Sequence, residues 1–492
     1  MENTNFLELL LNPLLLTDGY KTGHHIQYPD NTNLVYSNLT ARSNKYAPNN
    51  TSEVLSFAQE MTIKEIHLLF KNNFFSRPKE EVCGEMKREL SMYLNYDYDV
   101  THFEELHDLG YLPIKVKALD EGELVPIKVP LMTIYNTHPK FYWITNYLET
   151  IISNLIWKPM VSATTAFQYR KLLTEWMKKT DIDNDEFINW QGHDFSMRGL
   201  DGIYPTISSG LGHSLSFTGS DSLPVIYGAR KYYNEDGFVI GSVNATEHSV
   251  MCAGGRESEI ETFRRLINIY QLGILSIVSD TWDLWKVLTD YVVELKEEIL
   301  ARDGKLVIRP DSGNPVDIIC GDPSAETEHQ RKGVVELLWD VFGGTTNEQG
   351  YKVLNPKIGA IYGDSITLKR AEDICKRLEE KGFASTNVVL GIGSFTYQYN
   401  TRDTFGFAMK ATYVEVEGEG REIYKDPITD SGIKKSARGL LKVVKSDGEY
   451  KLIDRVSWDE EKTGELKTIY ENGQFKRETK FSKIRERVTS KI

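Results

Sequence analysis

The sequence predicts an α/β protein with an irregular (β/α) barrel-like core and a mixed α+β domain formed by the N- and C-terminal parts. Two observations support this fold class. Five short apolar runs lie between residues 237 and 396, with helix-like segments between them, and such alternation is typical of parallel βαβ units. After residue 405 apolar and polar residues alternate instead, as in antiparallel strands.

Each of the five apolar runs is an expected core strand, and each is followed by a polar cluster. The runs and the residues that come after them are 238–243 with Glu247, His248 and Ser249; 274–278 with Ser279 and Asp280; 306–308 with Arg309 and Asp311; 358–362 with Gly363 and Asp364; and 388–390 with Gly391, Gly393 and Ser394. In parallel barrels and sheets the carboxyl ends of the strands build the active site. We therefore expect these clusters to meet.

Further elements complete the predicted architecture. We expect helices at 54–70, 142–156 and 366–382, a helix opened by a capping box at 258–261, and strands at 114–118, 411–416 and 439–444. The predicted domains are a flanking domain of residues 1–160 together with 396–492, and a barrel-like catalytic core of residues 161–395.

Composition excludes several classes of protein. The 492 residues carry a net charge of −13, which argues against nucleic acid as the main partner because phosphate backbones require basic surfaces. The four cysteines form no CxxC pair, so a zinc site or disulfide scaffold is not expected. The apolar run at 6–16 is too short to span a bilayer. We expect a cytoplasmic protein without a membrane partner.

The strand ends carry residue types that bind a charged sugar. Asp280, Asp311 and Asp364 come after three separate strands, and carboxylates there hold a metal, a hydroxyl or a cation. A helix N-cap is the alternative for any one of them. Glycines at 363 and 393 let backbone N–H groups approach a phosphate, although such short runs are often plain turns.

Three other signals are weaker. Phe195 precedes Arg198 by three residues, which suits stacking on a heterocycle and binding of a phosphate, or simply a core ring and a surface cation. His248 could act as an acid, a base or a nucleophile, with its ring fixed by Glu247. A late basic group is either a second anion site or a solvated face, and includes Arg402, Lys410, Lys425, Lys434, Lys435 and Arg438.

These residues resemble the nicotinamide phosphoribosyltransferase family, within the type II phosphoribosyltransferases, almost from end to end. The matching strings are 17–21 with His24, 27–29, 142–150, 193–199, 217–221, 247–249, 278–280, 308–315, 363–364, 401–403 and 424–427. The string Ile-Arg-Pro-Asp-Ser-Gly-Asn-Pro together with Glu-His-Ser is highly specific. The sequence departs from animal members after Gly393, where their phosphate loop is richer in glycine, and at Ala408, where they have serine.

The resemblance implies transfer of the phosphoribosyl group from 5-phosphoribosyl 1-pyrophosphate to nicotinamide, with Mg²⁺ as cofactor and ATP as a coupled substrate. It assigns catalysis to His248, as the histidine that ATP phosphorylates, and to Asp280, Asp311 and Arg309, with Mg²⁺ near Asp280 and Asp311. It assigns substrate binding to Tyr20, Phe195, Arg198, Asp221, Gly363, Asp364, Gly393, Ser394, Arg402, Arg42, Lys410 and Lys425.

In that assignment the pyridine ring lies between Phe195 and Tyr20 of the partner subunit, so a homodimer with shared sites is expected. Asp221 accepts the carboxamide N–H. Arg198 and Arg309 hold pyrophosphate, and the remaining substrate residues contact the ribose and the phosphates.

Three alternatives compete with this interpretation. A nicotinate phosphoribosyltransferase is disfavoured by Asp221, which would repel a carboxylate on the ring. A non-catalytic nucleotide-binding homologue is disfavoured by the joint presence of His248, Asp280, Arg309 and Asp311. A Mg²⁺-dependent barrel lyase or aldolase would fit the carboxylates but would need a lysine or another base at a strand end.

Overall fold

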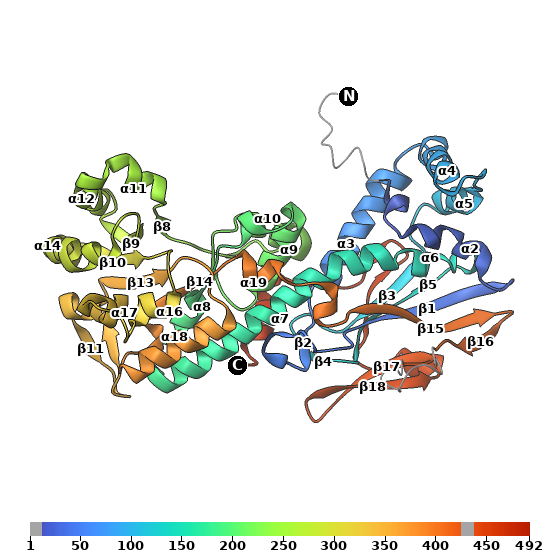
Figure 1. The fold of residues 1–492 in the computed structure, drawn as a ribbon. Helices are drawn as coiled ribbons and strands as arrows, with labels where there is room; N and C mark the ends of the chain where they lie inside the picture. The colour runs from blue at the N-terminus through green and yellow to red at the C-terminus, as the bar shows by residue number, and fades with distance from the viewer. Residues whose placement is uncertain (1–11, 425–436) are drawn as a thin grey trace. The chain divides into compact units, whose positions relative to one another are not determined.

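The computed structural model describes residues 12–424 and 437–492. The described chain forms two compact units (Figure 1). The first unit comprises the chain up to Val161, Arg230–Asn234 and Thr401–Arg487, and the second comprises Ser162–Ala229, Glu235–Asn400 and Val488–Ile492. That residues 1–160 with 396–492 and residues 161–395 are separate domains stays a prediction.

The first unit is built on a seven-stranded antiparallel sheet that joins the two ends of the chain. Its strands in spatial order are β16 (Glu419–Glu422), β15 (Ala408–Val416), β1 (Thr32–Thr40), β5 (Pro130–Asn136), β3 (Ile114–Ala118), β19 (Lys467–Glu471) and β20 (Gln474–Phe475). Because β1 pairs with both β5 and β15, an early strand lies between a middle one and a late one.

A hairpin and several helices complete the first unit. Strands β17 (Leu440–Ser446) and β18 (Glu449–Val456) pair through a turn at Asp447 and Gly448, which both have positive φ, as a two-residue hairpin of this twist requires. The helices include α3 (Gln59–Phe70), α4 (Lys79–Leu94) and α5 (Thr101–Leu109). The predicted strand at 114–118 and those near 411–416 and 439–444 are confirmed.

The second unit contains a seven-stranded sheet in which every paired strand runs parallel. Its spatial order is β7 (Gly219–Ser220), β6 (Gly192–Asp194), β14 (Val388–Ile392), β13 (Ile358–Tyr362), β10 (Asp303–Arg309), β9 (Leu272–Val278) and β8 (Asn244–Ala245). Helices connect the strands, among them α12 (Glu259–Ile269), α17 (Glu328–Phe342) and α18 (Leu368–Glu380) (Figure 1). The predicted α/β class with a parallel barrel-like core is confirmed.

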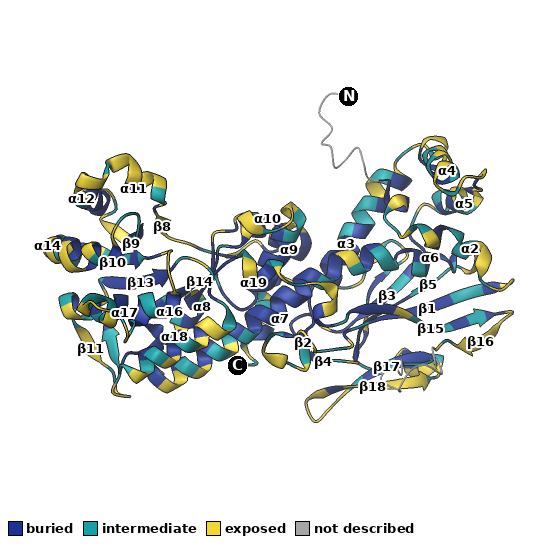
Figure 2. Cartoon of the chain, viewed as in Figure 1, coloured by how far each residue is buried: buried dark blue, intermediate teal, exposed yellow. Residues whose placement is uncertain are grey.

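Alternation along the strands separates a packed face from a lining face. On β10, Leu306 and Ile308 are fully buried in the main apolar cluster of this unit, which also contains Ile374 and Leu378 of α18. The intervening side chains of β10 turn to the opposite face, because successive side chains of a strand alternate. Figure 2 shows the resulting pattern, with buried strands and helices that are buried on one side.

Four expectations about local structure need correction. The run 238–243 is not a strand apart from a bridge at Gly241, and the short strand β8 comes after it instead, because Gly241 and Ser242 interrupt the apolar residues. Ser258 precedes α12 without a side-chain cap, so the capping box is wrong although the helix is right. Residues 53–55 form strand β2 before α3 begins. The helix expected at 142–156 is α6 (Ile144–Tyr147) followed by α7 (Glu149–Thr180), which continues through Pro159.

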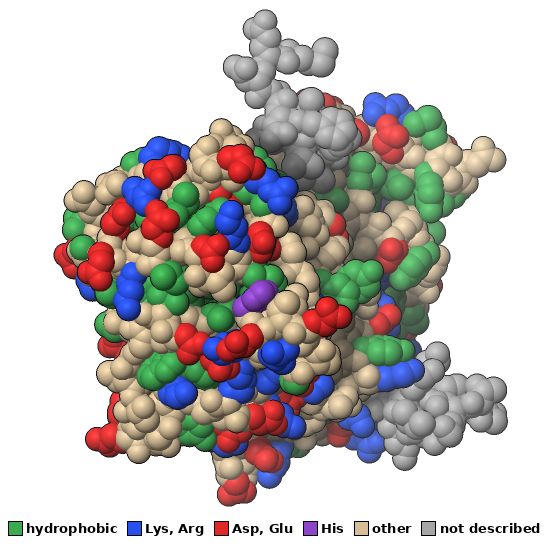
Figure 3. Space-filling view, turned by 60° about the vertical axis from the view of Figure 1, so that its left-hand side comes forward, with side chains coloured by type: hydrophobic (Ala, Val, Ile, Leu, Met, Phe, Trp, Pro, Cys, Tyr) green, Lys and Arg blue, Asp and Glu red, His purple; other side chains and the backbone are tan. Residues whose placement is uncertain are grey.

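The surface contains charged side chains of both signs. On the face that Figure 3 shows, Lys and Arg side chains are interspersed with Asp and Glu rather than gathered in a separate region. Among the described helices, none combines the length and the apolar character that crossing a membrane requires.

Candidate active site

Two adjoining cavities lie at the parallel sheet of the second unit. The inner cavity, of about 900 Å³, is lined by the inward side chains of the strands, and the rim cavity, of about 920 Å³, is lined by the loops at their carboxyl ends. Four residues line both cavities, namely Phe195, Asp221, Ala245 and Arg309. The two spaces therefore meet at these residues.

The rim cavity brings together most of the strand-end residues that the sequence predicts. Its lining includes Phe195, Arg198, Asp221, His248, Arg309, Asp311, Gly363, Asp364 and Ser394. They lie at or after the ends of β6, β7, β8, β10, β13 and β14, so the prediction that the strand ends meet is confirmed.

Asp280 connects two of the strand-end loops. Its Oδ2 accepts hydrogen bonds from the backbone N–H groups of Asp311 and Ser312, both at 2.7 Å. Its Oδ1 is buried and has no hydrogen-bond partner among the described residues. One oxygen of Asp280 therefore orders the loop after β10, while the other remains available as a ligand.

The loops after β13 and β14 approach so closely that glycine is required. A Cβ atom at residue 393 would lie 1.8 Å from Asp364 Oδ1, and one at residue 363 would lie 3.0 Å from Asp311 Oδ1. A Cβ at residue 199 would likewise lie 2.2 Å from Ser394 Oγ. The glycines thus permit four loops, those after β6, β10, β13 and β14, to approach one another beside the rim cavity.

His248 lies between a hydroxyl and two carboxylates. Its Nδ1 is 3.0 Å from Thr281 Oγ1, and its Nε2 is 3.9 Å from Asp280 Oδ1 and 3.8 Å from Asp311 Oδ2. Within the described chain the carboxylate of Glu247 instead accepts a hydrogen bond from Ser249. The expectation that Glu247 fixes the imidazole is therefore wrong, because the residue in contact with Nδ1 is Thr281.

Arg309 presents a buried guanidinium to both cavities. One Nη2–H donates to the carbonyl of Thr246 at 2.8 Å, and the buried Nε has no partner among the described residues. Burial lowers the pKa of Arg309, and the charges of Asp311, Asp221 and Asp280 oppose that shift. The guanidinium remains charged, because arginine does not lose its proton in proteins, and it keeps donors for an anionic ligand.

Asp221 is held by two neighbours that sequence reasoning did not assign. His193 Nε2 lies 3.0 Å from Asp221 Oδ1, and the hydroxyl of Ser242 donates to the same oxygen at 2.5 Å. Burial alone would raise the pKa of Asp221, but the hydrogen bonds from His193 and Ser242 and the charge of Arg309 outweigh it and the pKa is lowered. Asp221 is therefore a carboxylate at neutral pH.

The same region contains a pair of aromatic rings that pack against each other. The rings of His193 and Phe195 lie 4.5 Å apart with an interplanar angle of 32°. Since these residues are two apart at the end of β6, their side chains lie on one side of it, which was the available sequence signal for His193. Ser242 had no comparable signal, because it lies in an irregular segment.

The remaining predicted residues that the structure describes lie in the first unit. Arg42 Nε donates to the carbonyl of Gly406, and the backbone N–H of Arg42 donates to Phe405, so Arg42 packs on the loop that contains Arg402. Lys410 is exposed on the adjoining strand β15. Tyr20 is also exposed, with its ring 5.7 Å from that of His24. Lys425, together with Lys434 and Lys435, lies outside the described residues.

The chain is similar to a family of known proteins over most of its length. The family model described as "Nicotinate phosphoribosyltransferase (NAPRTase) family" matches residues 190–474. A protein named nicotinamide phosphoribosyltransferase from Acinetobacter baylyi is 49% identical and covers 98% of each chain. Proteins of the same name from Mycoplasma pneumoniae (36%, covering 85% of this chain and 93% of that one) and Xanthomonas campestris (32%, 97% and 98%) also match.

Solved structures share the fold at low sequence identity. A nicotinate-nucleotide pyrophosphorylase from Pyrococcus furiosus superposes with a TM-score of 0.59 at 15% identity, covering 100% of this chain and 97% of that one. Human nicotinic acid phosphoribosyltransferase gives 0.56 at 16%, covering 96% and 93%. Both similarities concern the fold alone.

Proposed function

This chain belongs to the nicotinate phosphoribosyltransferase family, and on that premise we propose that it makes nicotinamide mononucleotide. It transfers the phosphoribosyl group of 5-phosphoribosyl 1-pyrophosphate to the pyridine nitrogen of nicotinamide and releases pyrophosphate, a step of NAD salvage. The names of its relatives in Acinetobacter, Mycoplasma and Xanthomonas support nicotinamide as the acceptor.

The observation that carries this proposal is the ionised Asp221 beside the paired rings of His193 and Phe195. Its Oδ1 is engaged by His193 and Ser242, so Oδ2 is the oxygen left to accept the carboxamide N–H. Nicotinate would bring a second carboxylate to the same place, and two like charges in a partly buried site repel strongly. A nicotinate phosphoribosyltransferase is therefore the less favoured candidate.

The rim cavity supplies charges that match the transition state. Displacement at the anomeric carbon builds positive charge on the ribose while pyrophosphate leaves as an anion. Asp311 and Asp364 face the sugar, and Arg309 and Arg198 face the leaving group, with all four lining one cavity. Phe195 holds the pyridine in line beneath the anomeric carbon, which supplies proximity.

The carboxylates Asp280 and Asp311 fit a divalent cation. Among the described residues no group of three or more His, Cys, Asp or Glu side chains forms a ready metal site, but Mg²⁺ is usually bound by one or two carboxylates together with substrate phosphates. The buried Oδ1 of Asp280, which accepts no hydrogen bond from the described residues, is a suitable ligand. When bound there, Mg²⁺ would neutralise developing charge on the pyrophosphate.

ATP coupling through His248 is part of the same proposal. Contact with Thr281 orders Nδ1, which leaves Nε2 as the nucleophile for the γ-phosphorus of ATP. The N–P bond forms, the bond from the γ-phosphorus to the bridging oxygen breaks, and ADP leaves with the electron pair. The phosphohistidine would then alter the charge at the pyrophosphate site and favour synthesis.

A homodimer with shared sites completes the proposal. The first unit contributes Tyr20, Arg42, Arg402 and Lys410 as the contacts expected of a neighbouring subunit, and three of these are cations that an acidic chain needs in order to bind a polyanionic substrate.

One assay tests the proposed reaction. The purified full-length chain is given 5-phosphoribosyl 1-pyrophosphate and Mg²⁺ with nicotinamide or nicotinate, with and without ATP. We expect nicotinamide mononucleotide and pyrophosphate in equal amounts, a marked preference for nicotinamide, and stimulation by ATP. Preferential formation of nicotinate mononucleotide, or no transfer to either base, would overturn the proposal.

A further inference from the structure

The inner cavity has a second cationic end that the proposed reaction does not use. Lys305, Val307 and Arg309 alternate along β10 and all three line the cavity. At about 3.3 Å per residue, Lys305 and Arg309 are roughly 13 Å apart along the strand. Arg309 lies at the rim where the cavities meet, so Lys305 marks the opposite, inner end.

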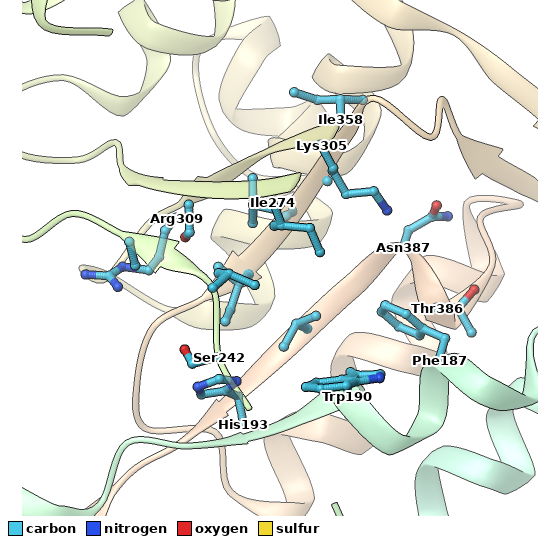
Figure 4. Close-up of a pocket in the computed structure, with 18 of the residues that line it drawn as sticks. Phe187, Trp190, His193, Ser242, Ile274, Lys305, Arg309, Ile358, Thr386 and Asn387 are labelled. Carbon is cyan, nitrogen blue, oxygen red and sulfur yellow. The ribbon is translucent and has the colours of Figure 1, made fainter. Parts of the chain in front are cut away.

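The wall between the two cations is mostly apolar and partly aromatic, and its one polar group midway is the buried Ser276 hydroxyl, which has no hydrogen-bond partner among the described residues. It is formed by Val307, Ile274, Ile361 and Val389 from four neighbouring strands, with Trp190 and Phe187 on the side of α8 (Ile188–Gln191). Figure 4 shows Lys305 extending from its strand on the side of Asn387, with the Trp190 and Phe187 rings facing the same space. A planar aromatic ligand would contact the aromatic side chains on one of its faces and the aliphatic side chains on the other.

The fold makes room for the lysine. A Cβ at Gly359, on neighbouring strand β13, would lie 3.2 Å from Lys305 Cδ, so the absence of a side chain there lets the aliphatic stem cross the sheet. Burial lowers the pKa of Lys305, which is the effect of removing an ammonium group from water without supplying a counter-charge.

Neighbouring polar groups do not supply that counter-charge. Among the described residues Lys305 Nζ has no hydrogen bond or ion pair, and the carboxylate found in the cavity lining is Asp221, which is engaged by His193 at the rim. Asn387 Oδ1 accepts from the Leu354 backbone N–H at 2.8 Å, and the Thr386 hydroxyl donates to Asp181. The ammonium group is therefore the polar group at this end that the protein leaves unmatched.

We propose that the Lys305 end of the inner cavity binds an aromatic monocarboxylate, with the carboxylate on the Lys305 ammonium and the ring between Trp190 and the aliphatic wall. A single cation with an apolar surround matches one negative charge better than a phosphate dianion, which needs several donors. The site is distinct from the pyridine position, because it lies at the other end of β10 and attracts the charge that Asp221 repels. It would let an acidic aromatic metabolite occupy the space behind the pyridine.

Calorimetry with a matched pair of probes tests this site on the full-length protein. Biphenyl-4-carboxylate and biphenyl-4-carboxamide have the same body and differ in charge. We expect the carboxylate to bind about tenfold or more tightly than the carboxamide, because a hydrogen bond between two charged groups is stronger than one from an ammonium group to a neutral amide. Equal affinity of the two probes, or no binding of either, would overturn the proposal without bearing on the transferase reaction, since no substrate is present.

Variants identify the residue responsible. Lys305→Met keeps the stem and removes the charge, so it should abolish the preference for the carboxylate while carboxamide binding persists. Lys305→Arg should retain the preference, and Lys376→Met on the exposed face of α18 should leave both affinities unchanged. A preference that survives in Lys305→Met would place the carboxylate elsewhere and refute the assignment. If Lys305→Met does not fold, the probe pair on the parent chain and Lys305→Arg still decides.

Discussion

The neighbours of single residues determine what those residues can do in this site. Asp221 stays ionised although it is partly buried, because His193, Ser242 and Arg309 each favour the carboxylate. His248 has a hydroxyl at one ring nitrogen and two carboxylates beyond the other. These surroundings lead to one expectation for each residue.

The first concerns recognition of the carboxamide. Asp221→Asn replaces the acceptor by a neutral amide, so kcat/KM for nicotinamide should fall about tenfold to a hundredfold, in line with about 1.5–3 kcal/mol for a hydrogen bond to a charged group. Discrimination against nicotinate should relax at the same time. Initial rates with both bases measure the change, and Asp183→Asn, at an exposed position, serves as control. A variant that keeps the full parental preference would contradict the role of Asp221.

The second concerns ATP. His248→Ala should lose ATP hydrolysis and ATP stimulation while still binding nicotinamide mononucleotide, because the ring surface at Phe195 is untouched. Acid-labile label from γ-labelled ATP should appear on the parent protein and not on the variant. Thr281→Val should weaken labelling, since Nδ1 loses its contact, whereas Thr281→Ser should retain it. If His248→Ala hydrolyses ATP at the parental rate, His248 is not the phosphorylated residue and can only contact pyrophosphate.

Strand ends and their adjoining loops set the geometry of the phosphate region. The loops after β13 and β14 touch through Asp364 and Gly393, where no Cβ can fit. The loops after β9 and β10 are joined by Asp280. The position of each loop therefore depends on its neighbour in the sheet.

Separating two of these loops should affect one substrate selectively. Gly393→Ala forces Asp364 away, and overpacking of this kind costs about 1–3 kcal/mol. The KM for 5-phosphoribosyl 1-pyrophosphate should rise about tenfold, while binding of nicotinamide to the free enzyme, measured by calorimetry, should remain near the parental value. The matched control is Gly84→Ala in α4, where a Cβ meets nothing within 4 Å and helix propensity favours alanine. Unchanged kinetics in Gly393→Ala would exclude this loop from substrate binding.

At the scale of the whole molecule, two subunits should complete one site. Tyr20→Ala and Asp311→Ala subunits are each expected to be inactive alone. In a random mixture half the dimers are hybrid and one of their two sites is intact, so about a quarter of the parental activity should return. Subunit exchange is verified by mass, and absence of recovery after exchange would contradict shared sites.

Several features of this protein could be predicted from local sequence. Four of the five expected core strands lie where an apolar run predicts them, although β10 and β14 are longer than their runs. The residues after them were expected to converge because parallel strands end at one edge. Asp311, Gly363 and Asp364 were found in this way, and they line the cavity. The prediction for 238–243 was wrong because its apolar residues suggested pairing that only the complete sheet decides.

The rest was decided by contacts between residues far apart in the sequence. His193 and Ser242 meet on Asp221 from different segments, and Thr281 rather than the adjacent Glu247 contacts His248. In the sequence, Lys305 is only a polar residue beside an apolar run. In the folded sheet its side chain passes over Gly359 and lines the inner cavity. Local sequence determines which segments form strands and which polar residues end them, because propensity and alternation act over a few residues. Which side chains share a charge or a cavity depends on the order of strands in the sheet, and that order is fixed only when the whole core is packed.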